Sequence, residues 1–240
     1  MREGVDMQQK PIDRYPKLQA RYEVLEQQRQ AHLNLGQQML TTGDGKLYVT
    51  DFVMVAVLKR SLDLLDGISC LTDRWNLAAA APLLRLQIDS LLKLVYLAHV
   101  EFADAVSKAI LDEEKPFRKI KDSDGKFLTD ARLRDHATRF YPWLDRVYDE
   151  TSKLIHLSDR HLLFIIESFD DKTGTLGFFI GTGNQNRPES EIDNFLDVFS
   201  CTTDALLKVV LGWVISKGSA TKADTGTETT DGNSQLGHFM

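Results

Sequence analysis

The sequence predicts an all-α fold, a helical bundle with a small β-hairpin inserted before the last helix. Apolar residues recur every three or four positions through most of the chain, which is the spacing of one buried helix face. Two short β-branched and aromatic runs flank a turn at 170–174, as expected for a hairpin. Hydrophobic residues make up 42% of the 240 positions, enough for one buried core. We therefore expect a single domain over 1–218, with its core in 50–217.

The N-terminal half predicts helices of different character. The segment 16–40 is rich in Gln, Arg and Glu, which is typical of an outer helix that packs along a narrow stripe. More apolar helices are expected at 50–74 and 77–100. Pro82 lies inside the latter pattern, so it either opens a later start or kinks the helix. A shorter helix over 101–114 follows.

The next part of the chain is more polar and ends in the hairpin. We expect a surface loop over 115–140 that carries a short helix near 130–140, and then a helix over 143–159. The apolar runs 162–169 and 176–180 are separated by Asp, Lys, Thr and Gly, which favour a turn.

The last helix has clear start and stop signals. Pro188 is followed by acidic residues that complement the helix dipole, and Lys217 and Gly218 are expected to close the helix. The polar segment 219–240 is expected to be a disordered tail. The stretch 205–215 is apolar on nearly every side, more than one buried face requires, so we expect a homodimer.

Composition limits the classes of site and location. Cys70 and Cys201 lie far apart in apolar helical patterns, and we interpret them as reduced core residues rather than a disulfide or a metal site. We expect no metal and no cofactor. The net charge of −6 argues against broad, non-specific binding of nucleic acid, but it does not exclude a local basic pocket. No signal peptide is recognised and no apolar run is long enough for a membrane span, so we expect a cytoplasmic protein without membrane contact.

The first candidate functional feature is a polar stripe on the helix 77–100. Arg85, Asp89 and Lys93 follow one another at steps of four, so they share one face of an otherwise apolar helix. A buried charge without a partner costs several kcal/mol. The stripe is therefore either an internal Arg85–Asp89 pair that faces solvent at the edge of the bundle, or part of a polar site between helices.

The second feature is a stripe on the helix 143–159. Tyr148, Ser152 and His156 are again four residues apart, and Arg160 and His161 follow at once. Histidine exchanges protons near neutral pH, so the set has the donors and proton carriers of a catalytic or anion-binding site. The alternative is that His156 only packs and caps the end of its helix.

A short loop over 181–184, Gly-Thr-Gly-Asn, lies between the hairpin and the last helix. Its backbone amides could cradle a phosphate at the helix start. The loop lacks the full spacing of the known phosphate-binding motifs, so a plain connecting loop is favoured.

Across 50–215 the chain resembles bacterial helical proteins of the HEPN type (higher eukaryotes and prokaryotes nucleotide-binding). The matching residues are Arg85 and Asp89 on one helix, then Tyr148, Ser152 and His156 on a later one. The resemblance implies a helical bundle that often dimerises and, in active members, a metal-independent ribonuclease of toxin–antitoxin or phage-defence systems. In those members histidine moves protons and arginine steadies the phosphate. This chain lacks their closely spaced Arg and His on one helix, so a catalytic pair would form between helices, Arg85 with His156.

Two functional hypotheses follow. The first is a HEPN-like protein of a bacterial stress or phage-defence system that cleaves RNA with Arg85 and His156. In this hypothesis the remaining polar residues support catalysis or bind the ligand: Asp89, Lys93, Tyr148, Ser152, Arg160 and His161. The second is a non-catalytic helical adaptor or nucleotide-binding module. The expected ligands are RNA or a nucleotide in the first case, and a nucleotide or a partner protein in the second. We also predict that Arg85 and Asp89 face the second stripe across a helix–helix contact. The ribonuclease hypothesis needs Arg85 and His156 to line one accessible cleft, whereas an adaptor could bury or separate them.

Overall fold

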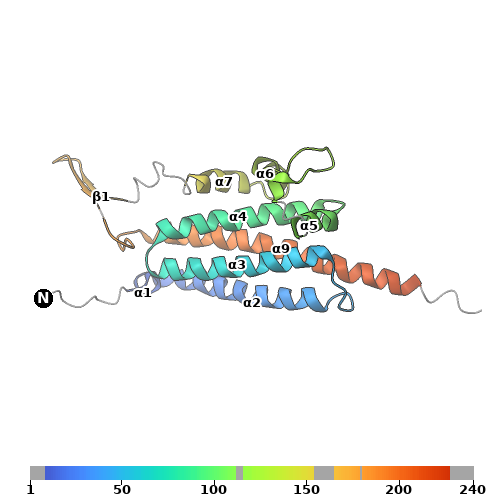
Figure 1. Cartoon of the computed structure of the whole chain (residues 1–240). Helices are drawn as coiled ribbons and strands as arrows, with labels where there is room; N and C mark the ends of the chain where they lie inside the picture. The colour runs from blue at the N-terminus through green and yellow to red at the C-terminus, as the bar shows by residue number, and fades with distance from the viewer. Residues whose placement is uncertain (1–8, 112–115, 154–164, 179, 228–240) are drawn as a thin grey trace, which may run out of the picture.

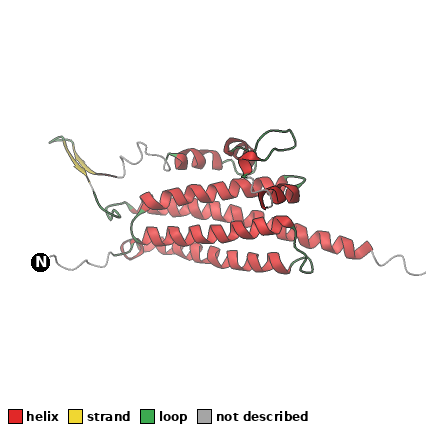
Figure 2. Ribbon diagram, viewed as in Figure 1, coloured by secondary structure: helices red, strands yellow, loops and turns green. Residues whose placement is uncertain are grey.

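The computed structural model describes residues 9–111, 116–153, 165–178 and 180–227. These residues are mostly helical, and they include one two-stranded antiparallel hairpin before the last helix (Figure 2). The prediction of an all-α bundle with an inserted hairpin is therefore confirmed.

The helices vary greatly in length, and the four longest form the body of the molecule. The single sheet is the pair β1–β2, with Phe169 opposite Leu176. In chain order the elements are α1 (Pro11–Arg14), η1 (Pro16–Leu18), α2 (Gln19–Thr41), α3 (Val49–Asp73), α4 (Leu77–His99), α5 (Ala103–Leu111), η2 (Phe117–Lys119), α6 (Asp130–Ala137), α7 (Leu144–Ser152), β1 (Ile166–Asp170), β2 (Thr175–Phe178) and α9 (Glu189–Thr227).

The body is a four-helix bundle in which α2, α3, α4 and α9 each pack against two neighbours (Figure 1). Short links at 42–48 and 74–76 join α2 to α3 and α3 to α4, so these consecutive helices are antiparallel. The long connection 100–188 returns the chain to the end where α4 begins, and α9 then runs parallel to α4 (Figure 1). Along this connection α6 and α7 pack on the outer side of α4.

The boundaries of α2, α3 and α4 match the expected ranges closely. The proline in question, Pro82, lies inside α4, which begins at Leu77 with the Asn76 side chain accepting from the amide of Ala79. Pro82 is thus not a first-turn residue. The second half of the helix expected at 143–159 lies outside the described residues.

The core is apolar and continuous through the bundle. Helix α4 contributes the most central side chains because nearly all of its circumference is covered by α3, α9, α6 and α7. Fully buried members include Leu65, Ile68, Ile88, Leu91, Leu92, Leu94, Phe199 and Leu206.

A buried polar layer crosses this core and joins all four long helices. On α2, His32 Nδ1 lies 2.7 Å from the Gln28 carbonyl, which can only accept a hydrogen bond. Its Nε2 lies 2.7 Å from the Ser61 hydroxyl on α3, and Ser61 accepts in turn from the Gln87 amide on α4 at 2.6 Å. Gln87 also donates to Thr203 on α9 at 3.0 Å. The geometry fits a neutral imidazole that donates from Nδ1 and accepts at Nε2.

A buried ion pair closes one end of the bundle. The Asp51 carboxylate, in the first turn of α3, accepts from Lys217 Nζ at 2.7 Å and from Trp213 Nε1 at 2.7 Å, both on α9. It also accepts from the amide of Tyr48 at 2.9 Å. Lys217 donates further to the carbonyl of Met39 on α2 at 2.9 Å. The Lys217 and Asp51 side chains are 1% and 2% exposed, so this pair joins three helices away from water.

The predicted end of the last helix is wrong. Helix α9 continues through Lys217 and Gly218 to Thr227, so the first part of the segment expected to be a disordered tail is helical. Lys217 points into the bundle and does not cap the helix. Gly218 allows close packing instead, because a Cβ there would lie 3.2 Å from the Thr42 methyl group. Residues 228–240 lie outside the described part of the chain.

The interpretation of the cysteines is also corrected. Cys70 and Cys201 are free thiols, as expected, but both are exposed on the surface of the bundle rather than buried in its core. An apolar pattern around a residue does not settle which face of the helix that residue occupies.

The apolar stretch that predicted a homodimer is largely buried within one chain. Ala205, Leu206 and Val210 pack into the core of the bundle, whereas Leu211 and Ile215 are exposed at 41% and 60%. A central helix needs apolar residues on several sides, so this pattern has an explanation within the monomer. The apolar stretch therefore no longer argues for a homodimer, which remains a prediction.

By length and composition alone, one helix of the described chain, over Glu189–Ser219, is apolar enough to cross a membrane. In its most apolar window 56% of the residues are buried inside the bundle, and core helices of folded domains share this composition. The cytoplasmic location stays a prediction.

We predict that Asp51→Ala destabilises the fold by about 3–5 kcal/mol, because it leaves the Lys217 ammonium buried without its carboxylate. Urea denaturation measures the loss. The matched control is Lys59→Met, which breaks the exposed Lys59–Asp63 pair and should cost less than about 1 kcal/mol. Equal losses in the two variants would contradict the role of the buried pair.

We also predict that stability falls as the pH drops below about 6.5, the ordinary pKa of histidine. Burial lowers the pKa of His32, so the unfolded chain takes up a proton that the folded chain resists, and acid therefore favours unfolding. The variant His32→Gln should show a shallower loss of melting temperature between pH 7 and pH 5. An unchanged slope would contradict this account.

Candidate functional site

The candidate site lies on the outer face of α4, where α6 and α7 cover it. At its centre the Arg85 guanidinium donates to the Asp89 carboxylate one turn further along α4. Arg85 is only 5% exposed, while the Asp89 side chain is 23% exposed. The buried position of the arginine follows from the neighbouring helix α7, which lies over this part of α4.

Tyr148 on α7 covers the Arg85 guanidinium. The centre of the guanidinium lies 3.8 Å from the centroid of the Tyr148 ring, which is a close cation–π contact. Burial raises the pKa of the Tyr148 hydroxyl, the carboxylates of Asp130 and Asp89 raise it further, and Arg85 opposes them. The two stripes expected to meet therefore do so through Arg85 and Tyr148.

A second arginine, from α6, completes this cluster. The Arg134 guanidinium lies 5.2 Å from the Tyr148 ring centroid. It is held by Asp149 at 2.8 Å and by Asp145 at 3.4 Å, both on α7. The sequence analysis missed Arg134, because its contact with Tyr148 depends on where α6 docks, and no spacing along the chain reports that position.

Ser152, the other described residue of the second stripe, does not bind Asp89. The Ser152 hydroxyl donates to the carbonyl of Tyr148 in its own helix at 2.7 Å. The predicted catalytic His156 and its neighbours Arg160 and His161 lie outside the described residues.

Further along α4 the contacts are mainly aromatic. The Lys93 ammonium lies 5.8 Å from the Phe117 ring, away from the Arg85 cluster. His99 stacks on Phe140 at 3.9 Å and lies 5.8 Å from His136 of α6. Burial lowers the pKa of His136, with His99 adding to the shift, and its Nε2 is buried without a hydrogen-bond partner among the described residues. We interpret this group as the packing contact that holds α6 on α4.

The loop 181–184 is explained by packing. The amide of Asn184 donates to the carbonyl of Trp75 at 3.2 Å. Gly183 has a positive φ of 72°, and a Cβ there would lie 2.2 Å from the carbonyl oxygen of Arg74. The glycine therefore lets the loop fit against the turn between α3 and α4, as expected for a connecting loop.

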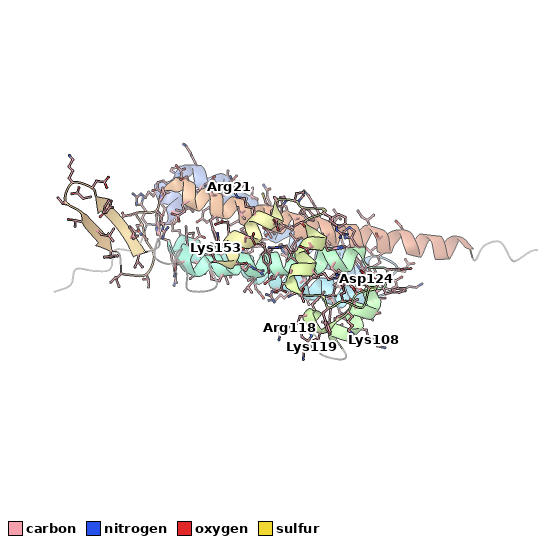
Figure 3. The ribbon with its side chains drawn as sticks, turned by 90° about the horizontal axis from the view of Figure 1, so that it is seen from above. Arg21, Lys108, Arg118, Lys119, Asp124 and Lys153 are labelled. Atoms are coloured by element: carbon pink, nitrogen blue, oxygen red, sulfur yellow. The ribbon has the colours of Figure 1, made fainter. Side chains whose placement is uncertain are left out.

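A basic loop projects beside this face, between α5 and α6. Arg118, Lys119, Lys121 and Lys126 are exposed, and among the described residues none of the four forms an ion pair. Lys121 lies 5.2 Å from the ring of Phe127, which is 51% exposed. Figure 3 shows Arg118, Lys119 and Lys108 along one edge of the molecule.

The acidic residues of this loop are already engaged. Asp122 and Asp124 both bind Arg132 at the start of α6, the latter at 3.0 Å. The four exposed cations therefore keep their charge unopposed at the surface of a chain whose net charge is −6. We call residues 116–127 the basic loop.

No protein-family model, curated protein or solved structure matches this chain. Within the described residues, no three His, Cys, Asp or Glu side chains gather closely enough to hold a metal ion. The chemistry of the site is thus argued from its own geometry.

That geometry gives different roles to Arg85 and to the basic loop. Arg85 is buried, paired with Asp89 and covered by Tyr148, so it joins α7 to α4 and is shielded from an approaching phosphate. The basic loop, in contrast, offers exposed donors to an anion.

We predict that Tyr148→Leu costs about 1–2 kcal/mol, because it removes the ring that covers the Arg85 guanidinium. The variant Tyr148→Phe keeps the ring and should be nearly neutral. In a double-mutant cycle, Tyr148→Leu and Arg85→Met should couple by at least about 0.5 kcal/mol, measured by urea denaturation. If Tyr148→Phe is as damaging as Tyr148→Leu, the hydroxyl and not the ring carries the contact.

Proposed function

We propose that this protein is a HEPN-like helical module of a bacterial stress or phage-defence system that binds single-stranded RNA through its basic loop. The observation that carries the proposal is the group of exposed, unpaired cations at Arg118, Lys119, Lys121 and Lys126. Phosphate binding depends on such local clusters of Lys and Arg rather than on the net charge of the chain.

Aromatic side chains among the cations favour single-stranded RNA over a folded acidic partner. Phe127 is half exposed beside Lys121, and an unpaired base can stack on such a ring while the ammonium contacts its phosphate. Phe117 is packed against Lys93 and anchors the other side of the loop to α4. A duplex would hide its base faces and leave Phe127 unused.

The burial of Arg85 favours binding over cleavage. A ribonuclease needs a cation at the position where charge builds up on the phosphate. Arg85 is 5% exposed, forms an ion pair with Asp89 and is covered by the Tyr148 ring. Exposing it would therefore break the contact between α4 and α7. We therefore favour the non-catalytic hypothesis over the Arg85–His156 ribonuclease.

We predict that the double variant Arg118→Gln, Lys119→Gln weakens binding of a fluorescent oligouridine RNA about tenfold at low salt, measured by fluorescence anisotropy. Loss of two phosphate contacts should also lower the magnitude of the salt slope by about 1.4, since each contact to a single strand contributes about 0.7.

The matched control is Lys59→Gln, Arg60→Gln, which removes the same charge from exposed positions on α3. This control should bind RNA as tightly as the unaltered protein. Equal weakening by the two double variants, or no binding by the unaltered protein, would overturn the proposal.

The ribonuclease hypothesis has one observation in its favour, the contact of the two polar stripes through Arg85 and Tyr148. Incubation of the purified protein with total RNA in EDTA tests it directly. We expect intact RNA from both the unaltered protein and His156→Ala. Degradation by the unaltered protein alone would establish the ribonuclease instead.

A further inference from the structure

A cavity at the end of the bundle opposite the hairpin has the size of a ligand pocket. Its volume is about 470 Å³, and it lies between the start of α3, the start of α5 and the face of α9 that carries Trp213. Small-molecule sites usually measure roughly 300–1,000 Å³ and combine apolar walls with a few polar groups. The cavity shares no residue with the basic loop.

Three aromatic side chains from three parts of the chain line this cavity: Tyr48, Phe102 and Trp213. Phe102 is 65% exposed, so its ring is accessible to a ligand. Trp213 is fixed in place because its Nε1 donates to the buried Asp51 carboxylate. Aromatic rings of this kind bind cations through their electron-rich faces.

The charged groups of the lining favour a cationic ligand. At the floor, Lys217 donates to Asp51 and to the Met39 carbonyl, so its charge is balanced inside the protein. At the wall, Asp104 accepts from the amide and the hydroxyl of Thr50. Glu101 is exposed and has no ion-pair or hydrogen-bond partner among the described residues.

The sum over these groups is negative. Lys217 and Asp51 neutralise each other, and the carboxylates of Glu101 and Asp104 remain. Both carboxylates would repel an anionic ligand. A cation would be attracted by the two carboxylates and by the faces of the three rings.

We propose that this cavity binds a small organic cation, a quaternary ammonium or alkylamine with an apolar body. The ammonium head lies against Glu101 and the aromatic rings, and the apolar body fills the space beside them. The buried Asp51–Lys217 pair and Trp213 form the fixed floor, and Phe102 forms the exposed wall.

Isothermal titration calorimetry of the full chain with choline tests this proposal. The comparison ligand is the neutral isostere in which carbon replaces the quaternary nitrogen. We expect choline to bind saturably and the isostere to bind at least about fivefold more weakly, because it lacks the charge that the rings and Glu101 recognise.

Two exposed positions give variants that should fold normally. Glu101→Gln removes the unpaired carboxylate and Phe102→Ala removes the exposed ring, and each should weaken choline binding about fivefold or more. The matched control, Asp171→Asn, removes an exposed carboxylate in the hairpin turn at the other end of the molecule and should leave binding unchanged. Circular dichroism checks that all three variants are folded.

Three results would overturn the proposal. They are the absence of choline binding, equal affinity for the charged and neutral ligands, and equal effects of Glu101→Gln and Asp171→Asn. Because RNA binding is tested at the basic loop with other variants, either proposal can fail while the other stands.

Discussion

The buried pair of Asp51 and Lys217 sets the position of the last helix relative to the first two. Helix α9 follows a long connection and runs parallel to α4, so no tight turn determines its register. The contacts of Lys217 with Asp51 and with the Met39 carbonyl do so instead, because a shift of one residue would leave a charge buried without its partner. The same pair orients Trp213 and thereby shapes the floor of the end cavity.

The polar layer around His32 has a related effect near the middle of the bundle. Apolar side chains can interdigitate in more than one register of the helices. The hydrogen bonds from His32 through Ser61 and Gln87 to Thr203 form in only one register, so they fix how the helices align. With the bundle held in this way, the outer face of α4 is a stable base for α6, α7 and the basic loop. The proposed RNA-binding surface therefore depends on contacts that lie on the opposite side of α4.

Much of the fold was predictable because helical periodicity, caps and turn residues are local signals. The ranges of α2, α3 and α4 and the hairpin followed from these signals. The meeting of Arg85 with the Tyr148 stripe followed from the need of each polar stripe for a partner. The buried position of Lys217 was not predictable. A lysine followed by glycine is a common signal for the end of a helix, and its distant partner Asp51 cannot be recognised from the sequence. The exposure of Cys201 likewise depends on which faces of α9 its neighbours cover.

The same limit applies to the candidate site. Spacing placed Arg85 and Asp89 on one face, but their burial is decided by α7, whose packing is a long-range property. The basic loop was overlooked as a site because its cations are mixed with Asp122 and Asp124 in sequence. Only the structure shows that Arg132 engages these two carboxylates and leaves the cations unopposed.

The parallel arrangement of α4 and α9 has a kinetic consequence. Helices α2, α3 and α4 are joined by short links and can associate early, because closing a short loop costs little entropy. Helix α9 must wait for the connection 100–188 to be synthesised and returned to the starting end. Until it docks, Gln87 lacks Thr203 and Asp51 lacks Lys217, so the nascent three-helix intermediate exposes both an apolar groove and an unpaired carboxylate. An apolar groove exposed in this way favours aggregation, and a charged residue beside it opposes aggregation.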